Sequence, residues 1–363
     1  MSSDAEVIKK LENAGKEIAK QIHAGKNPEF KLPVRSLNNI YFDQKSQTIK
    51  LGDKTSERQF LNTAHTRKFM QTMLVANEIK NVIGENATVS IRDLYYALKH
   101  SIEGTQENTF EDQSESDPVI EDIEASLNLL REELHLAASS KGVIAGDMKI
   151  KDGKDTIDLN KMGSGGWGVP SNVEPEKIEI KDLNAEYVLF IEKDAVWKRF
   201  NEDRFWQKNK CIIITGRGQP SRAERRFVQR LNKEFKLPVF ALMDADPWGM
   251  YIYSVIKQGS ISLSYSEEKL ATPETKYIGL TVKDVETYKI PKEVTIKLNK
   301  LDEKRLTEME GYEWFKKKEW QEEFRRMREK AIKLELEALS KKGIRFITEE
   351  YLPDKIRNKD FLP

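Results

Sequence analysis

The chain is nearly free of cysteine. Cys211 is the only one among 363 residues, so neither an internal disulfide framework nor a cysteine-based zinc site can form. The four histidines are scattered, and we interpret none of them as a zinc ligand. No stretch approaches the roughly 18 apolar residues of a membrane span, and no apolar targeting segment follows Met1. These absences predict a protein of the cytoplasm that makes no contact with a membrane.

An excess of one charge is also missing. Lys and Arg total 61 against 60 Asp and Glu, so the net charge is +1 and favours no class of partner. The distribution of charge says more. Residues 104–125 carry eight acids and no base, whereas residues 216–236 carry seven Lys or Arg against two acids. The second region is basic in the manner of a surface that faces phosphates.

Three short apolar runs follow one another in the second half of the chain, separated by helical patterns. They cover residues 187–191, 211–215 and 239–243. Such alternation predicts a parallel sheet whose crossovers are right-handed. We therefore expect an α/β fold in this part and an α+β organisation over the whole chain.

Acidic side chains come directly after two of these runs. Glu192 follows the first run, and Asp244 and Asp246 follow the third. Because ligands collect beyond the carboxyl ends of parallel strands, carboxylates at that edge would suit Mg²⁺. The alternative is structural, since an Asp before Pro247 is a common helix start and residues 192–194 would also serve as a helix cap. The local pattern leaves both interpretations open.

A predicted helix over residues 91–101 carries a tyrosine on its outer face. The buried face consists of apolar residues at helical spacing, namely Ile91, Leu94, Tyr95 and Leu98. Tyr96 lies five positions after Ile91 and therefore points away from the core. Three basic side chains share its outer face: Arg92, Lys99 and His100.

A phenol among cations is a reasonable nucleophile towards phosphorus. A neighbouring guanidinium such as that of Arg92 favours the phenolate of Tyr96 over the phenol. An amphipathic helix with a solvated cationic face explains the same residues. The local sequence alone favours this plainer interpretation.

The first half of the chain is predicted to be helical and then to form a hairpin. Helices are expected at residues 67–83, with Gly84 as the C-cap, and at residues 91–101, capped by Thr88 or Ser90. The acidic segment after Gly104 is expected to be a solvated loop, followed by a third helix over about residues 120–134. Apolar pairs on both sides of a turn at residues 145–147 predict the hairpin. Three helices and a hairpin are the order of a winged helix-turn-helix unit, a common DNA-docking scaffold.

Two further helices are predicted in the second half. In the basic region, one face of a helix presents Arg222, Arg226 and Arg230, and the opposite face buries Phe227, Leu231 and Phe235. Such a face suits phosphates, although many surface helices look similar. Residues 301–342 are predicted to be mostly charged helix with four buried aromatic anchors, Trp314, Phe315, Trp320 and Phe324.

Together these motifs resemble the A-subunit family of DNA topoisomerase VI, the type IIB enzymes related to the meiotic double-strand-break transesterase. The matching segments are Arg92-Asp93-Leu94-Tyr95-Tyr96, Glu192 after its strand, Gly216-Arg217-Gly218-Gln219-Pro220-Ser221-Arg222 with Arg225-Arg226-Phe227, and Asp244-Ala245-Asp246-Pro247-Trp248-Gly249 with Gly259-Ser260. The similarity runs from about residue 67 onward in the family's order and spacing. Each motif is weak alone, but together they outweigh the plainer interpretation of Tyr96. One departure is Trp248, where tyrosine is more usual, and we expect it to alter packing rather than metal binding.

The resemblance implies a division into domains. Residues 1–66 would be an N-terminal extension, for which docking to a partner is the suggested role. Residues 67–152 would form a winged-helix (CAP-like) domain, and residues 153–185 a linker or hairpin. Residues 186–363 would form a Toprim-type parallel α/β domain with a C-terminal helical elaboration.

The resemblance also implies roles for individual residues. Tyr96, the second of the Tyr-Tyr pair, would be the nucleophile that forms a 5′-phosphotyrosyl link, and Arg92 would be the active-site arginine. Mg²⁺ would be held by three carboxylates, those of Glu192, Asp244 and Asp246. Duplex DNA would be contacted by basic residues, namely Lys99, His100, Arg217, Arg222 and Arg226.

The family acts as a homodimer in which the tyrosine of one protomer meets the metal site of the other. It works with a GHKL-type ATPase B subunit in an A2B2 heterotetramer that is associated with the nucleoid, and the B subunit binds the ATP. Two alternatives remain for this chain. One is a Toprim nuclease in which metal-activated water cuts DNA and Tyr96 is only structural, and the other is a non-enzymatic winged-helix DNA-binding protein.

Overall fold

The computed structural model describes residues 2–139 and 141–363, and the chain forms two compact units. Unit 1 comprises Met1–Tyr41, Lys50–Ser139 and Ile261–Ser266. Unit 2 comprises Phe42–Ile49, Ser140–Ser260 and Glu267–Pro363. Within the described residues, no helix is both long enough and apolar enough to cross a membrane.

Unit 1 is mainly helical. Its elements are α1 (Asp4–His23), β1 (Glu29–Pro33), β4 (Thr55–Gln59), α2 (Thr66–Gly84), β5 (Val89–Ser90), α3 (Ile91–Leu98), α4 (Gln113–Leu127) and β6 (Leu136–Ala137). Strands β1 and β4 pair antiparallel, and the short β5 and β6 pair parallel. A further hairpin, β2 (Ile40–Asp43) with β3 (Thr48–Leu51), contributes residues to both units.

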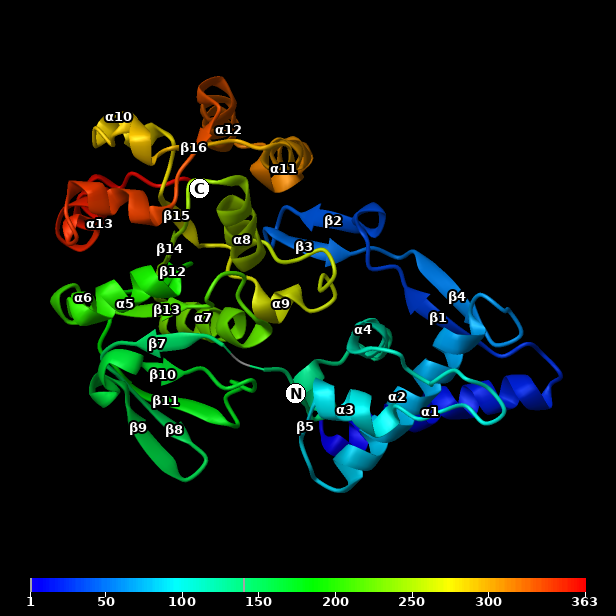
Figure 1. The fold of residues 1–363 in the computed structure, drawn as a ribbon. Coiled ribbons are helices and arrows are strands. Elements are labelled where there is room, and N and C mark those ends of the chain that lie inside the picture. Colours follow the sequence, from blue (N-terminus) through cyan, green and yellow to red (C-terminus); the bar gives the residue numbers. More distant parts are fainter. Residues whose placement is uncertain (1, 140) are drawn as a thin grey trace. The chain divides into compact units, whose positions relative to one another are not determined.

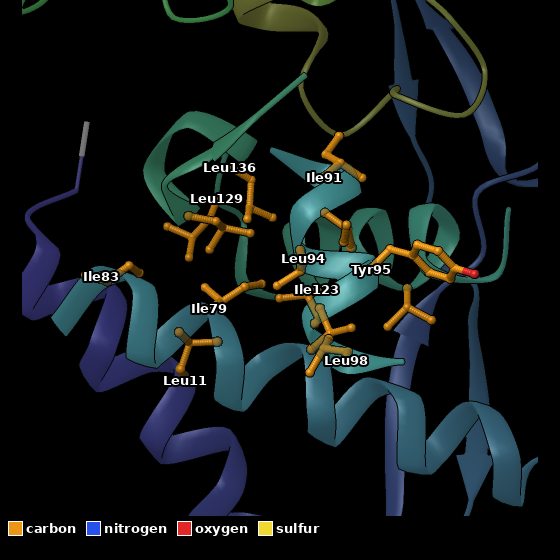
Figure 2. Packing of buried hydrophobic residues seen from close by; sticks show 14 of the residues in the cluster. Leu11, Ile79, Ile83, Ile91, Leu94, Tyr95, Leu98, Ile123, Leu129 and Leu136 are labelled. Atoms are coloured by element: carbon orange, nitrogen blue, oxygen red, sulfur yellow. The ribbon is translucent and has the colours of Figure 1, made fainter. Parts of the chain in front are cut away.

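The core of unit 1 forms where α3 packs with α2 and α4. Figure 2 shows Leu94 and Leu98 of α3 pointing towards Ile79 of α2 and Ile123 of α4. The ring of Tyr95 closes the edge of this cluster, and its hydroxyl group points outward. The predicted buried stripe of α3 is therefore confirmed, because apolar residues three and four positions apart fall on one helical face.

The helix boundaries in unit 1 differ in detail from those predicted. Ser90 caps α3 as expected, since its side chain accepts a 3.0 Å hydrogen bond from the backbone N–H of Asp93. The helix ends at Leu98 rather than Ser101. The prediction that Gly84 caps α2 was wrong, because Gly84 is the last helical residue and Glu85 is the cap.

The acidic segment is only partly a loop. Helix α4 begins at Gln113, capped by Asp112, whereas the prediction began it near residue 120. Arg67 lies 3.2–3.4 Å from three of the acids, Glu107, Glu111 and Glu115. Arg35 pairs with two more, Glu121 and Asp122. These five acids therefore each pair with a base from elsewhere in unit 1.

The main sheet of unit 2 has six strands in the order β10-β7-β13-β12-β14-β15. They are β7 (Val143–Ala145), β10 (Trp167–Gly168), β12 (Tyr187–Ile191), β13 (Cys211–Thr215), β14 (Val239–Leu242) and β15 (Lys276–Gly279). Strand β12 pairs parallel with β13 and β14, and β14 pairs parallel with β15 (Figure 1). The three predicted strands and their parallel arrangement are confirmed.

The hairpin predicted around residues 145–147 is not formed. Strand β7 instead joins the main sheet, antiparallel to β13. The next strand, β8 (Met148–Asp152), joins a separate three-stranded sheet with β9 (Asp155–Asp158) and β11 (Ile178–Leu183). The turn at Gly146 therefore leads the chain from one sheet to another. The apolar pairs on either side of this turn do not show which strands each of them will join.

Short helices complete unit 2. They are α5 (Asp194–Glu202), α6 (Phe205–Lys208), α7 (Arg222–Phe235), α8 (Pro247–Lys257), α9 (Glu267–Leu270), α10 (Lys283–Thr287), α11 (Lys300–Gly311), α12 (Lys318–Lys330) and α13 (Leu352–Asn358). The predicted charged helix over 301–342 is α11 and α12, followed by a strand, β17 (Ile332–Lys333), that pairs with β16 (Ile296–Lys297). The four aromatic anchors predicted for this segment are buried, at 0–8% exposure.

Candidate active site

The carboxyl edge of the parallel strands gathers the three predicted acids in unit 2. Glu192 follows β12 directly and is 9% exposed, and Asp244 lies two residues beyond β14 and is 4% exposed. The backbone N–H of Asp244 donates to Oε2 of Glu192 at 3.0 Å. Parallel pairing of β12 and β14 brings these two strand ends together, although 52 residues separate them in sequence.

Asp246 lies at the start of α8 as its N-cap. Its Oδ1 accepts the backbone N–H of Gly249 at 2.6 Å, so the predicted helix start before Pro247 is confirmed. Strand pairing of β14 ends at Leu242, and the strand therefore does not extend to Asp246. The segment 192–194 does start α5, as the structural alternative predicted: Lys193 is the N-cap, Asp194 is the first helical residue, and Glu192 precedes the cap.

Burial makes this cluster electrostatically unfavourable for negative charge. Burial, reinforced by the charge of Asp244, raises the pKa of Glu192 to about 8. Burial also raises the pKa of Asp244 to about 6, although the N–H of Leu336 and the ammonium of Lys193 oppose this shift. The pKa of Asp246 is raised as well, first by burial. A site of this kind has a deficit of positive charge.

Lys193 supplies part of that charge, and the sequence analysis did not foresee it. Its Nζ lies 3.0 Å from Oδ2 of Asp244 and 2.8 Å from Oε2 of Glu337. Burial alone would lower the pKa of Lys193, but its contacts with Glu337 and Asp244 raise it. The backbone N–H of Leu336 donates to Oδ1 of Asp244 at 2.8 Å, so the segment after β17 forms one side of the cluster.

The carboxylate oxygens of this cluster suit a hard cation, although the side chains do not by themselves enclose a site for one. Among the described residues, no three His, Cys, Asp or Glu side chains are spaced to enclose a metal ion. Carboxylate oxygens are the ligands that Mg²⁺ prefers, and Mg²⁺ commonly uses only one or two of them with water and phosphate. Buried carboxylates with raised pKa values fit such a cation, because its charge would offset their mutual repulsion.

Gly249 allows α8 to start against these carboxylates. A Cβ atom at this position would lie 2.7 Å from the carbonyl oxygen of Asp244 and 3.1 Å from Oε2 of Glu192. The first contact is with backbone, which cannot move aside cheaply.

We expect Gly249→Ala to displace Asp244 and Glu192, to destabilise the protein by about 1–3 kcal/mol and to reduce activity sharply. Thermal unfolding and an activity assay would measure the two effects. Gly311→Ala is the matched control, because a Cβ atom there meets nothing within 4 Å. Equal behaviour of the two variants would contradict the close approach.

The predicted nucleophile lies in unit 1, on the outer face of α3. Tyr96 is 59% exposed, whereas its neighbour Tyr95 is 7% exposed, so the predicted orientations are confirmed. The guanidinium of Arg92 lies 5.9 Å from the centre of the Tyr96 ring. Lys99 donates to the hydroxyl of Tyr95 at 2.9 Å, and His100 is exposed. The structure thus brings Arg92 to Tyr96 and engages Lys99 with the adjacent tyrosine.

The basic helix α7 is more buried than predicted. Arg230 is 2% exposed and bonds the carbonyl oxygens of Val173 and Ile178, and Arg225 is equally buried against Glu267. Phe235, predicted to be buried, is 36% exposed. Much of this positive charge therefore stabilises unit 2 internally.

The other predicted DNA contacts are engaged to different degrees. Arg226 makes two hydrogen bonds to the carboxylate of Glu174, at 2.6 and 2.7 Å. Arg217 has a side chain 45% exposed and contacts Asp194 at 3.1 Å. The loop that carries Arg217 lies beside the carboxylates, since the N–H of Gly218 donates to the carbonyl oxygen of Glu192 at 2.9 Å. Arg222 is half-buried at the start of α7.

Comparison with known families accounts for most of the chain. Residues 187–356 match the Toprim domain family of the topoisomerase 6 A subunit and Spo11. Residues 67–136 match the family described as Type IIB DNA topoisomerase, and residues 141–184 match the all-beta domain in the DNA topoisomerase VI alpha subunit.

Similar proteins match nearly from end to end. The chain is 47% identical over 367 residues to the type 2 DNA topoisomerase 6 A subunit of Pyrococcus abyssi, with 98% of this chain and 95% of the relative covered. The chain belongs to the family of topoisomerase 6 A subunits. The family member of Sulfurisphaera tokodaii is 43% identical over 361 residues, covering 95% of this chain and 93% of the relative. The family member of Arabidopsis thaliana is 35% identical over 347 residues, covering 95% and 79%.

The family matches agree with the structural corrections. The Toprim match contains Glu192, Asp244 and Asp246, and the type IIB match contains Arg92 and Tyr96. The match to the all-beta family covers strands β7 to β11, where the predicted hairpin was not found. Membership in this family makes the chain one component of a type II DNA topoisomerase.

Proposed function

We propose that this chain cleaves and religates duplex DNA through a transient 5′-phosphotyrosyl link at Tyr96. The observation that carries the proposal is an exposed tyrosine beside an arginine, in a chain whose other unit holds a buried carboxylate cluster of the Toprim family. Two such chains, each cutting one strand, would produce a double-strand break.

The reaction is a transesterification. The Tyr96 oxygen attacks a backbone phosphorus in line, a P–O bond to Tyr96 forms, and the P–O3′ bond breaks to release a 3′-hydroxyl. The tyrosine proton leaves to solvent or a nearby base, and a proton is taken up by the departing 3′-oxygen. Arg92 would stabilise the phenolate and then the charge that develops on the phosphate oxygens. Bond energy is conserved, so the reverse attack by the 3′-hydroxyl reseals the strand.

We further propose that Glu192, Asp244 and Asp246 hold Mg²⁺. When bound, the ion would supply Lewis-acid stabilisation of the phosphate oxygens during the transesterification. The protein orients its carboxylates for this task through the N–H groups of Asp244, Leu336 and Gly249, which fix one oxygen of each acid. Lys193 adds positive charge beside Asp244.

The DNA and protein partners follow from the family. Unit 1 would dock DNA in the manner of a winged helix, with Lys99 and His100 near Tyr96, and Arg217 and Arg222 would contact phosphates from unit 2. Arg217 would have to leave Asp194, and Arg226 would have to leave Glu174, before either side chain reached DNA. Affinity carried by phosphate contacts falls steeply with salt and reads little sequence.

Assembly is also part of the proposal. We propose a homodimer that joins two copies of a GHKL-type ATPase B subunit to form A2B2, so that ATP drives the conformational cycle rather than bond exchange. Residues 1–66 are the proposed partner-docking extension. The enzyme would act on nucleoid DNA.

Relaxation of supercoiled plasmid tests this function. With ATP, Mg²⁺ and an added B subunit, the chain is expected to remove supercoils and to leave DNA ends covalently bound to protein when denaturant stops the reaction. Relaxation should be lost when either protein is left out. Ends that carry free 5′ phosphates and no protein would instead support the nuclease, and binding without any change of topology would support the architectural protein.

A further inference from the structure

An exposed tryptophan stands at the edge of the carboxylate cluster. The indole of Trp248 is 42% exposed, whereas the other five tryptophans are buried or half-buried. Trp248 lies two residues after Asp246, the N-cap of α8, in the first turn of the helix. The position of the ring is therefore tied to that of a proposed metal ligand.

Helix α11 holds this ring in place. The guanidinium of Arg305 lies 4.4 Å from the centre of the Trp248 ring and 4.7 Å from the centre of the Tyr251 ring. Arg305 is itself fixed by an ion pair with Glu308, at 3.0 Å, and Tyr312 lies nearby. Tyr312 stacks on Trp314 with ring centres 4.7 Å apart. A cation–π contact of this kind orients the indole and leaves its remaining surface to solvent.

We infer that Trp248 is a DNA-contacting residue whose indole packs on the deoxyribose and base next to the cleaved phosphate. This inference rests on the proposed function, because a phosphate bound beside a cation at Glu192 and Asp244 would bring its neighbouring nucleotide to the start of α8. Aromatic side chains stack on any base, and apolar rings also enter grooves at deformable steps. Both roles need a rigid, exposed ring beside the DNA backbone.

The charges around Trp248 favour nucleic acid over a protein partner. A protein interface usually centres on apolar surface that lacks charge. Trp248 instead follows Asp246 of the carboxylate cluster in the first turn of α8 and packs against the guanidinium of Arg305, a pattern that suits a phosphodiester with a planar base.

Tryptophan fluorescence tests the inference directly. A duplex of about 30 base pairs, titrated into the protein with its B subunit, is expected to quench emission of the wild type, and Trp248→Phe should abolish most of that quenching. Because phenylalanine keeps a ring, its affinity for labelled DNA in an anisotropy assay should fall little. Trp248→Ala should weaken DNA binding about tenfold, and the concentration of DNA at half-maximal relaxation should rise by a similar factor.

Trp167→Phe is the matched control, since Trp167 is half-buried in β10 and away from α8. DNA should quench the tryptophan emission of Trp167→Phe as strongly as that of the wild type. Full quenching in Trp248→Phe, together with unchanged DNA affinity in Trp248→Ala, would overturn the inference. The inference would also be overturned if Trp248→Ala kept its DNA affinity but showed a lower oligomeric state in light scattering. That result would assign the ring to a protein interface.

These experiments distinguish a failure of the proposed Trp248 contact from a failure of the proposed 5′-phosphotyrosyl chemistry. Quenching through Trp248 without any protein–DNA adduct would keep the contact and reject the 5′-phosphotyrosyl chemistry. An adduct formed at normal rate and normal DNA affinity by Trp248→Ala would keep the chemistry and reject the contact.

Discussion

Tyr96→Phe is expected to abolish covalent attachment to DNA and to lower relaxation by about ten-thousandfold or more, because it removes the nucleophilic oxygen. The fold should be unaffected, since the Tyr96 side chain is 59% exposed and its ring is kept. DNA affinity should also stay close to that of the wild type. Denaturing gels for the adduct, plasmid relaxation and thermal unfolding would measure the three quantities.

The neighbouring tyrosine offers a matched control. Tyr95 is 7% exposed, and its hydroxyl donates to the carbonyl oxygen of Glu111 at 2.9 Å and accepts from Lys99. Tyr95→Phe should therefore lose about 1 kcal/mol of stability and keep cleavage. The reverse result, an active Tyr96→Phe and an inactive Tyr95→Phe, would move the nucleophile to Tyr95.

Glu192→Gln is expected to lower DNA cleavage by about a thousandfold, a loss typical of removing electrostatic stabilisation from a transition state. Glutamine keeps an oxygen that can accept the N–H of Asp244, so the strand ends should stay together. The variant should also respond less to Mg²⁺. Thermal unfolding with and without Mg²⁺ is expected to show a clear stabilisation of the wild type and little or none of Glu192→Gln.

The pH dependence of stability gives the same substitution a second readout. The pKa of Glu192 is raised from 4.5 to about 8 in the folded protein, so the folded state binds the proton more tightly than the unfolded state. Metal-free wild type should therefore lose stability as the pH rises from about 4.5 to 8. Glu192→Gln cannot ionise and should lack this part of the loss.

Glu186→Gln controls for the removal of a negative charge. Glu186 stands just before β12, at the opposite end of the strand from Glu192, and its side chain is 70% exposed. It should cleave DNA and respond to Mg²⁺ like the wild type. Equal Mg²⁺ stabilisation of Glu192→Gln and wild type would remove Glu192 from the proposed ligands.

Local patterns in the sequence were enough to predict the parts of the site that depend on strand ends and helix faces. The apolar run before Glu192 is a fully buried parallel strand, and such strands have a continuous apolar signature. The split between Tyr95 and Tyr96 followed from helical periodicity, because one residue turns a side chain by about 100°.

The parts that the sequence did not predict depend on contacts between distant segments. Lys193 reaches Glu337 across 144 residues, and no local pattern encodes that pairing. The alternation in residues 332–337 was a missed signal of extended chain, hidden within a long charged stretch. The predicted hairpin is absent for a related reason. Strand β7 pairs with β13, which is far away in sequence, and not with the adjacent β8.

Mass spectrometry of the trapped cleavage complex tests the central claim most directly. The protein would be combined with ATP, Mg²⁺, plasmid and its B subunit, denatured during cleavage, digested with nuclease and protease, and searched for a nucleotide-modified peptide. A 5′-phosphate joined to the side chain of Tyr96 is the predicted result. A nucleotide on any other residue, or cleaved DNA whose 5′ ends are free of peptide, would contradict it.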